Sequence, residues 1–259
     1  MPRGLRAAQR PDDAVDHCLL GLRAAVRRAH AIVTPSRTTA EDVLSRTNVD
    51  PRKLHVVPEA AALPGSNVDV GEALKRLKLI PPYVLFVGTI EPRKNLVRLV
   101  RAYRRVAATG VPHGLVLAGP LGWHHERLMR ELALQGPGEI VLTGALAPDE
   151  LDAVYRAADA FVYPSVYEGF GLPVLEAMTR GVPVVASNTS SLPEVTGDAA
   201  IGVNPRSVRE LAAAIESLCT DVDLAERLAA AGRRRAERFS WDETAARTAE
   251  VYEKVLETK

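Results

Sequence analysis

Aromatic residues are scarce in this chain of 259 residues, of which they make up 5%, and cysteine occurs only twice, at Cys18 and Cys219. The two cysteines lie far apart and in no CxxC or other metal-ligand spacing. This argues against a disulfide framework or a zinc site. We therefore expect reduced thiols and a cytoplasmic location.

Long apolar runs are also missing. No segment approaches the roughly 18 apolar residues of a membrane span, and the basic N-terminus leads into Pro11-Asp12-Asp13 rather than a signal-peptide core. The formal net charge of +1 gives no overall field that would favour nucleic acid.

Asp12–Ala29 is predicted to be a surface helix with Arg23 and Arg27 on one side. The alternative is peripheral contact of this helix with the inner face of a membrane, or with a partner.

What the chain does have is 47% hydrophobic residues, mostly Ala, Val and Leu. From Tyr83 onward, short apolar runs alternate with helical patterns, which predicts an α/β fold with a doubly wound parallel sheet. The expected strands are Tyr83–Val87, Leu115–Ala118, Ile140–Leu142, Ala160–Tyr163, Val182–Ala186 and Ala199–Val203. The expected helices are Leu96–Ala107, His124–Leu134, Pro148–Ala157, Gly171–Thr179, Ser207–Cys219, Leu224–Phe239 and Trp241–Leu256.

The part before Tyr83 is less regular. Residues 1–64 are expected to hold two short strands, Ala31–Val33 and Leu54–Val57, with a helix between them that is capped by Ser36. So few strands make a poor independent core, and we interpret 1–64 as the remnant of another domain. Residues 65–82 are expected to be a linker, 83–240 the main domain, and 241–259 a C-terminal helix that packs back toward the N-terminal part.

Ligands of doubly wound sheets bind beyond the carboxyl ends of the strands, so the loops there are the candidate site. After the first strand, Arg93 and Lys94 stand just before a helix, where two cations and helix N–H groups suit a phosphate; solvated surface charge is the alternative. Gly88, at the strand end, permits close backbone approach. The short Thr143-Gly144-Ala145 loop suits a base edge read through the backbone.

The loop after the fourth strand carries Glu168, two glycines around Phe170, and then Glu176 within a predicted helix. Carboxylates accept charge-assisted hydrogen bonds, so both glutamates suit the hydroxyls of a sugar or ribose in one crevice. The alternatives from spacing alone are a helix cap at Glu168 and a salt bridge at the edge of the core for Glu176.

These residues resemble a known family. The run from Glu168 to Glu176 looks like the E-x(7)-E motif of retaining glycosyltransferases with two Rossmann-like domains, the GT-B class and its group 1 glycosyl transferases. The run Val87–Asn95 is similar to that family's donor-phosphate loop, and Leu117–Pro120, Gly181–Ala186 and Phe239–Trp241 also fit. The resemblance covers about residue 30 to the end and implies the C-terminal, donor-binding half of a GT-B fold with a truncated N-terminal segment.

The resemblance also implies roles for individual residues. Arg93 and Lys94 would hold the diphosphate of a nucleotide sugar, Glu168 would face the hexose and Glu176 would bind the ribose. The full implied set is Gly88, Thr89, Arg93, Lys94, Gly144, Ala145, Glu168, Gly169, Phe170, Gly171, Leu172 and Glu176, with Glu168, Arg93 and Lys94 as catalytic residues. No metal ion or other cofactor is implied. Thr89 departs from the family's usual arginine, which places more of the phosphate charge on Arg93 and Lys94.

The function implied is transfer of a hexose, with mannose slightly favoured, from a nucleoside-diphosphate sugar such as GDP-mannose or a UDP-hexose to an acceptor hydroxyl with retention of configuration. The acceptor would be a glycan or a lipid-linked molecule. Because most of the acceptor-side domain is not identifiable, the alternative is a nucleotide-sugar-binding module, or an inactive half-enzyme that needs an oligomer or a second chain for its acceptor domain.

Overall fold

The computed structural model describes residues 21–61 and 65–257, which form two compact units. The described part of Met1–Val57 and the end of the chain from Ala245 make one unit, and Pro58–Thr244 makes the other. Cys18 and the first half of the helix expected from Asp12 lie outside the described residues.

The smaller unit contains a two-stranded parallel sheet. Residues 21–28 are helical, and strand β1 (Ile32–Thr34) pairs with β2 (Leu54–Val56), Ile32 opposite Leu54. Between them lie helix α2 (Arg37–Arg46) and the 3₁₀ turn η1 (Pro51–Lys53). The hydroxyl of Ser36 accepts a hydrogen bond from the Thr39 N–H at 3.1 Å, which confirms the expected cap. Most of α11 (Trp241–Glu257) also belongs to this unit.

The larger unit is built on a six-stranded parallel sheet of order β5-β4-β3-β6-β7-β8. The chain moves outward from β3 to β5, then returns to the middle and moves the other way from β6 to β8, which is the doubly wound topology that the alternating pattern predicted. The strands are β3 (Tyr83–Val87), β4 (Gly114–Ala118), β5 (Ile140–Gly144), β6 (Ala160–Tyr163), β7 (Val184–Ser187) and β8 (Ile201–Val203).

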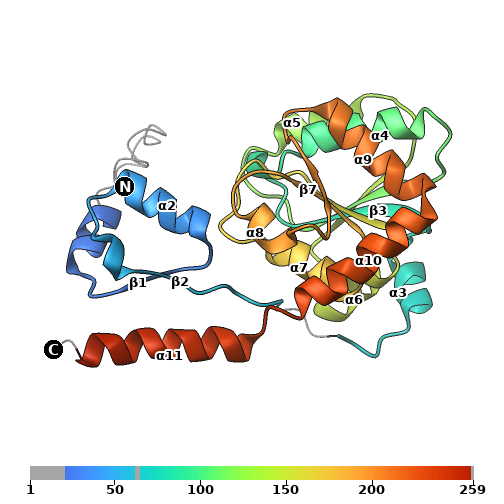
Figure 1. Cartoon of the computed structure of the whole chain (residues 1–259). Coiled ribbons are helices and arrows are strands. Elements are labelled where there is room, and N and C mark those ends of the chain that lie inside the picture. The colour runs from blue at the N-terminus through green and yellow to red at the C-terminus, as the bar shows by residue number, and fades with distance from the viewer. Residues whose placement is uncertain (1–20, 62–64, 258–259) are drawn as a thin grey trace, which may run out of the picture. The chain divides into compact units, whose positions relative to one another are not determined.

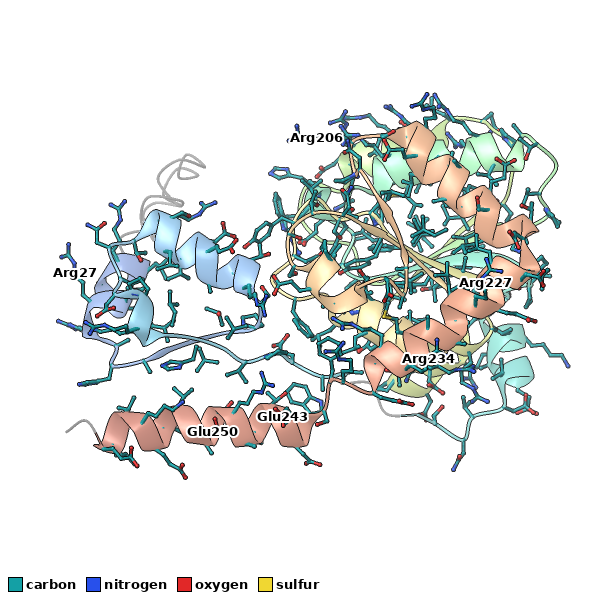
Figure 2. The ribbon with its side chains drawn as sticks, viewed as in Figure 1. Arg27, Arg206, Arg227, Arg234, Glu243 and Glu250 are labelled. Atoms are coloured by element: carbon teal, nitrogen blue, oxygen red, sulfur yellow. The ribbon has the colours of Figure 1, made fainter. Side chains whose placement is uncertain are left out.

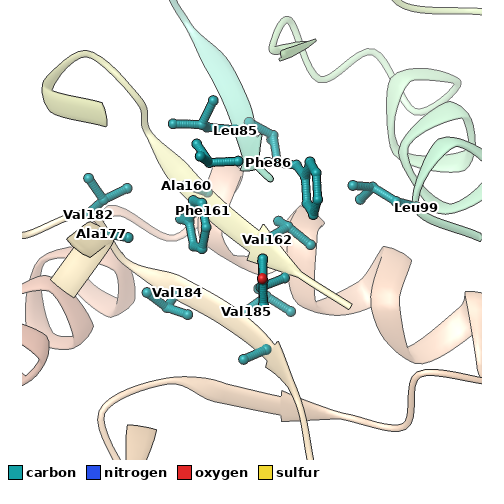
Figure 3. Packing of buried hydrophobic residues seen from close by; sticks show 14 of the residues in the cluster. Leu85, Phe86, Leu99, Ala160, Phe161, Val162, Ala177, Val182, Val184 and Val185 are labelled. Atoms are coloured by element: carbon teal, nitrogen blue, oxygen red, sulfur yellow. The ribbon is translucent and has the colours of Figure 1, made fainter. Parts of the chain in front are cut away.

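Helices cover both faces of this sheet (Figure 1). On one face α4 (Leu96–Ala107) packs against α5 (Glu126–Ala133) and α9 (Val208–Thr220). On the other face α7 (Leu172–Thr179) packs against α10 (Val222–Ala236), and α3 (Val70–Leu77) against α6 (Pro148–Arg156). Because both faces are covered, the inner strands are almost wholly apolar, and Ser187 at the end of β7 is a buried polar exception. Figure 3 shows Phe86, Phe161 and Val185 in one buried cluster with residues from the flanking helices.

Some boundaries differ from those expected. The strand predicted from Val182 begins at Val184, because the Val182 N–H donates to the Ala177 carbonyl at 3.0 Å and closes the end of α7 instead. Helix α10 starts two residues before the predicted Leu224, since Asp221 caps it by accepting from the Leu224 N–H at 2.9 Å. The sequence interpretation missed the short helix α8 (Leu192–Thr196) and the 3₁₀ turn η2 (Pro92–Lys94).

Candidate functional site

The candidate site lies where the sheet reverses direction, between β3 and β6. These strands are neighbours, but the chain leaves them toward opposite edges, so the loops that follow them part and leave a crevice at the carboxyl ends. The two loops are also tied together. The Val166 N–H donates to the Arg93 carbonyl at 2.9 Å, and the Asn95 amide donates to the Pro164 carbonyl at 3.0 Å. The structure therefore brings the two main predicted loops into contact.

A cluster of buried charges joins these loops. The carboxylate of Glu168 accepts from Lys94 Nζ at 2.7 Å with one oxygen and from Arg93 with the other. Lys94 Nζ also donates to the hydroxyl of Tyr163, at the end of β6. Glu168 and Lys94 are 7% and 6% exposed, so their mutual attraction is only weakly screened by water. The three residues predicted to be catalytic thus form one contiguous group.

A second carboxylate balances the charge of this group. Glu91 accepts two hydrogen bonds from Arg93, at 2.7 and 3.0 Å, and one from the indole N–H of Trp123 at 2.9 Å. Arg93 also donates to the carbonyl of Tyr167 at 3.0 Å. Two cations therefore face two carboxylates, and the arginine is held from both sides. Neither Glu91 nor Trp123 was identified from sequence, although Glu91 stands only two residues before Arg93.

Burial and neighbouring charges shift the pKa values of this cluster in different directions. Burial lowers the pKa of Lys94 below its usual value, and the charge of Glu168 offsets part of that effect. Burial also opposes the charge on Arg93, but Glu168 and then Glu91 outweigh it and raise the arginine pKa. The pKa of the Tyr163 hydroxyl is raised well above its usual value by burial and by the Glu168 charge. Glu168 therefore favours the charged form of Lys94, against the effect of burial.

Glycines allow the strand ends to approach one another. The Gly88 N–H donates to the Ala118 carbonyl and the Gly119 N–H to the Gly144 carbonyl, each at 2.9 Å. Gly119 has a φ of +144°, and a Cβ on it would overlap the Gly88 carbonyl. Gly144 differs, because nothing lies within 4 Å of the Cβ position there. The backbone at Gly144 is therefore open beside the exposed Ala145.

Comparisons with known proteins identify the family of this chain. The sequence profile of the family described as Glycosyl transferases group 1 matches residues 74–235, more than half of the chain. The chain belongs to this family. It is similar to the O-antigen chain mannosyltransferase B of Escherichia coli, with 35% identity over 93% of this chain and 65% of the relative. It is also 35% identical to the MMP alpha-(1->4)-mannosyltransferase of Mycolicibacterium hassiacum, over 89% of this chain and 55% of that protein.

Solved structures show the same fold for this group 1 chain. A sucrose-phosphate synthase from Thermosynechococcus elongatus superposes with a TM-score of 0.78 at 26% identity, covering 98% of this chain and 65% of that one. Anabaena HepE in complex with UDP and glucose gives 0.77 at 18% identity, covering 96% and 69%. The GT-B expectation for the fold is confirmed. The chain spans about two thirds or less of the length of the curated relatives named above.

The E-x(7)-E motif of this group 1 chain is supported by the loop Ser187–Leu192, which was expected at a strand end but in which no single residue was given a role. The Glu168 N–H donates to Ser190 Oγ at 3.1 Å. The buried hydroxyl of Ser191 lies 2.9 Å from the Glu168 carbonyl and 2.8 Å from the Phe170 carbonyl, and its single proton is shared between them. Gly171, at a φ of +122°, lets the chain turn into α7 against Leu192. The sequence feature that could have indicated this role is the pair of serines directly before Leu192-Pro193.

The two glutamates of the motif have different surroundings. Glu168 contacts the loop after β3, whereas the carboxylate of Glu176 on α7 accepts from the Tyr155 hydroxyl of α6 at 3.1 Å. Burial and the Glu176 charge raise the pKa of Tyr155 well above its usual value. The ring of Phe170 is buried and packs edge-on against Phe239, with centroids 5.8 Å apart, so only its backbone is available for a ligand. Gly169, Leu172 and Thr89 are half-buried beside these groups.

Two further findings concern metals and membranes. Within residues 21–61 and 65–257, no three His, Cys, Asp or Glu side chains are grouped so that they could hold a metal ion. In the same part of the chain, no helix has both the length and the apolar character needed to cross a membrane.

Proposed function

We propose that the unit Pro58–Thr244 binds a nucleoside-diphosphate hexose, and that the protein transfers the hexose to an acceptor hydroxyl with retention of configuration. The observation that carries this proposal is the buried carboxylate of Glu168 between Arg93 and Lys94 at the point where the sheet reverses. Sugar hydroxyls and a diphosphate need a carboxylate and cations side by side, and this group supplies both.

The cations keep capacity for a diphosphate. Lys94 has three N–H donors and uses two, toward Glu168 and Tyr163. Arg93 has five and uses four, toward Glu91, Glu168 and the Tyr167 carbonyl. One donor on each side chain is left to point at a phosphate oxygen. Two carboxylates already balance the two cations. A diphosphate would therefore bind most strongly if it displaced part of the hydrogen bonding between these cations and Glu168.

These donors would stabilise the step that is hardest in hexose transfer. As the glycosidic bond breaks, negative charge develops on the leaving diphosphate, and fixed cations in a water-poor crevice stabilise that charge without reorganising. Glu168, once shared with the sugar, would orient the hexose beside the same cations. The N-terminal end of α7 adds backbone donors after Gly171. Glu176 would bind the ribose, and the open backbone at Gly144 and Ala145 would border the base.

Mannose is the favoured hexose, because two of the relatives are mannosyltransferases. Isothermal titration calorimetry with GDP-mannose and UDP-glucose tests both parts of this proposal. We expect the full chain to bind GDP-mannose more tightly, and Glu168→Gln to weaken the sugar nucleotide more than the free nucleoside diphosphate. Absence of binding for both sugar nucleotides at millimolar concentration would refute donor binding.

A second candidate function is nucleotide-sugar binding without transfer by this chain alone. The group of Arg93, Lys94 and Glu168 would serve this function equally, since it needs only to hold the donor. Incubation with the sugar nucleotide and a panel of glycan and lipid-linked acceptors separates the two candidates. Transfer, or slow donor hydrolysis, supports the enzyme, and the anomeric proton of the product in NMR tests retention. Binding without either reaction supports the binding module.

A further inference from the structure

A second concave site lies against helices α4 and α5 of the larger unit. The cavity measures about 430 Å³ and is lined by residues of both helices and of the loops that precede them. This volume is within the range of small-molecule sites, roughly 300–1,000 Å³. Its lining shares Glu91 and Asn95 with the loop after β3, but it contains none of the residues assigned above to the sugar nucleotide.

Four arginines line this cavity. Arg98 and Arg101 are three residues apart on α4, and Arg127 and Arg130 are three residues apart on α5. Residues at this spacing lie on one face of a helix, so α4 and α5 each contribute two arginines to the lining of the same space. His124 and His125 add ring nitrogens at its rim. Like charges brought together in this way repel each other, and an anion between them would remove that cost.

The carboxylates nearby neutralise these arginines only in part. Glu91 is bound to Arg93 and Trp123, which leaves Glu126 as the other acidic residue of the lining. Outside the lining, Glu131 pairs with Arg101 at 2.7 Å, and its pKa is lowered first by that hydrogen bond. In the described part of the chain, Arg127 and Arg130 form no ion pair with any carboxylate, and Arg98 donates to the Asn95 side-chain oxygen at 2.8 Å.

We propose that this cavity binds a phosphate group carried by a ligand other than the sugar donor, either a small phosphorylated metabolite or a lipid headgroup. Guanidinium groups recognise phosphate through paired, charge-assisted hydrogen bonds. Groups that approach from two helices suit a tetrahedral oxyanion better than a planar carboxylate. The inference does not depend on the proposed function, because the two sets of residues are separate.

The experiment uses the full chain and inorganic pyrophosphate as the probe, titrated by calorimetry at physiological ionic strength in the presence of saturating GDP and UDP. The test variant is Arg127→Ala/Arg130→Ala. The matched control is Arg227→Ala/Arg234→Ala, which removes two exposed arginines from α10 (Figure 2). We expect pyrophosphate to bind the test variant about tenfold more weakly or worse, since each lost charge-assisted hydrogen bond has at least that effect, and the control variant to bind like the unmodified chain.

A second arm identifies the source of the phosphate. Phosphatidylcholine vesicles with and without phosphatidic acid are sedimented with each variant. Retention on the phosphatidic acid vesicles that is lost in Arg127→Ala/Arg130→Ala, and kept in the control, assigns the site to a lipid headgroup; pyrophosphate binding alone assigns it to a soluble ligand.

The proposal is overturned if neither probe binds at millimolar concentration, or if both double variants lose binding equally, which would indicate diffuse surface charge. GDP-mannose binding is measured in parallel on the same protein preparations, without GDP or UDP. If the unmodified chain does not bind GDP-mannose, that result counts against the proposed function and leaves the result at this cavity unaffected.

Discussion

The carboxylate of Glu168 and the ammonium group of Lys94 lie 2.7 Å apart, and both are buried although they come from loops 74 residues apart in sequence. Removing one partner of a buried ion pair leaves the other uncompensated, which is more costly than losing the pair itself. We therefore expect substitutions around this pair to change ligand affinity and the free energy of unfolding to different extents, so that the two effects can be measured separately.

Lys94→Ala should weaken the binding of GDP more than that of guanosine. The diphosphate loses a charge-assisted hydrogen bond of about 1.5–3 kcal/mol, or roughly tenfold to a hundredfold in affinity, whereas the nucleoside never used it. Calorimetry with both ligands measures the difference. Lys75→Ala, an exposed lysine on α3, is the control and should leave both affinities unchanged. Equal losses for GDP and guanosine in Lys94→Ala would contradict the phosphate role.

Glu176→Ala and Tyr155→Phe form a pair of variants that separates a ribose contact from a structural hydrogen bond. Both remove the bond between the Tyr155 hydroxyl and the Glu176 carboxylate, so both should lower the free energy of unfolding by about 1–3 kcal/mol. Only Glu176→Ala also removes the carboxylate, and only it should weaken nucleotide binding. Urea unfolding and calorimetry measure the two effects. Unchanged nucleotide affinity in a folded Glu176→Ala variant would assign this glutamate to the core alone.

Ser191→Ala should loosen the loop that holds Glu168. The buried hydroxyl shares its proton between the carbonyls of Glu168 and Phe170, and its removal leaves two acceptors without that donor at a cost of about 1–3 kcal/mol. We expect a lower urea midpoint together with weaker sugar-nucleotide binding. Ser45→Ala, which removes an exposed hydroxyl from α2, should change neither. Normal donor affinity in a destabilised Ser191→Ala variant would show that the serine supports only the fold.

The thiol of Cys219 should make the protein less stable at alkaline pH. Burial raises its pKa from 9.0 to about 12, so the unfolded chain loses this proton at a lower pH than the folded protein. The stabilising contribution is complete below pH 9 and is lost as the pH rises toward 12, at up to about 1.4 kcal/mol per pH unit. Urea unfolding at pH 8 and pH 10.5 under reducing conditions should show a smaller decline in Cys219→Ala than in the unmodified chain. Equal declines would mean that the thiol ionises normally.

Periodicity and composition were sufficient for most of the fold. Continuous apolar runs such as Tyr83–Val87 and Ala160–Tyr163 match β3 and β6 residue for residue, because strands covered on both faces leave no position for polar side chains. The alternation of strands and helices predicted the doubly wound order, and the rule for such sheets located the site at their carboxyl ends. The group 1 family was identified from Glu168–Glu176 and Val87–Asn95 together.

Local patterns were less informative about partners across the fold. Trp123, Ser190 and Ser191 were not chosen, because each bonds to a residue of another loop. Glu91 was not chosen although its partner Arg93 lies in the same loop. The sequence placed Glu168 and Glu176 in one crevice, yet only the packing of α6 on α7 gives Glu176 the hydroxyl of Tyr155. The arginine-lined cavity is another example, since Arg98 and Arg127 come from helices on different segments of the chain.

By itself, then, the sequence determined the class of fold, the strand ends where the candidate site is proposed, and the family. These depend on side-chain periodicity and on short motifs, which are properties of contiguous residues. The tertiary structure decided which charges meet: that Arg93 and Lys94 share Glu168, that Glu91 balances them, and that four arginines line a second cavity. Electrostatic energy depends on distance and burial rather than on separation along the chain, so these relationships exist only once β3, β6 and their helices have packed together.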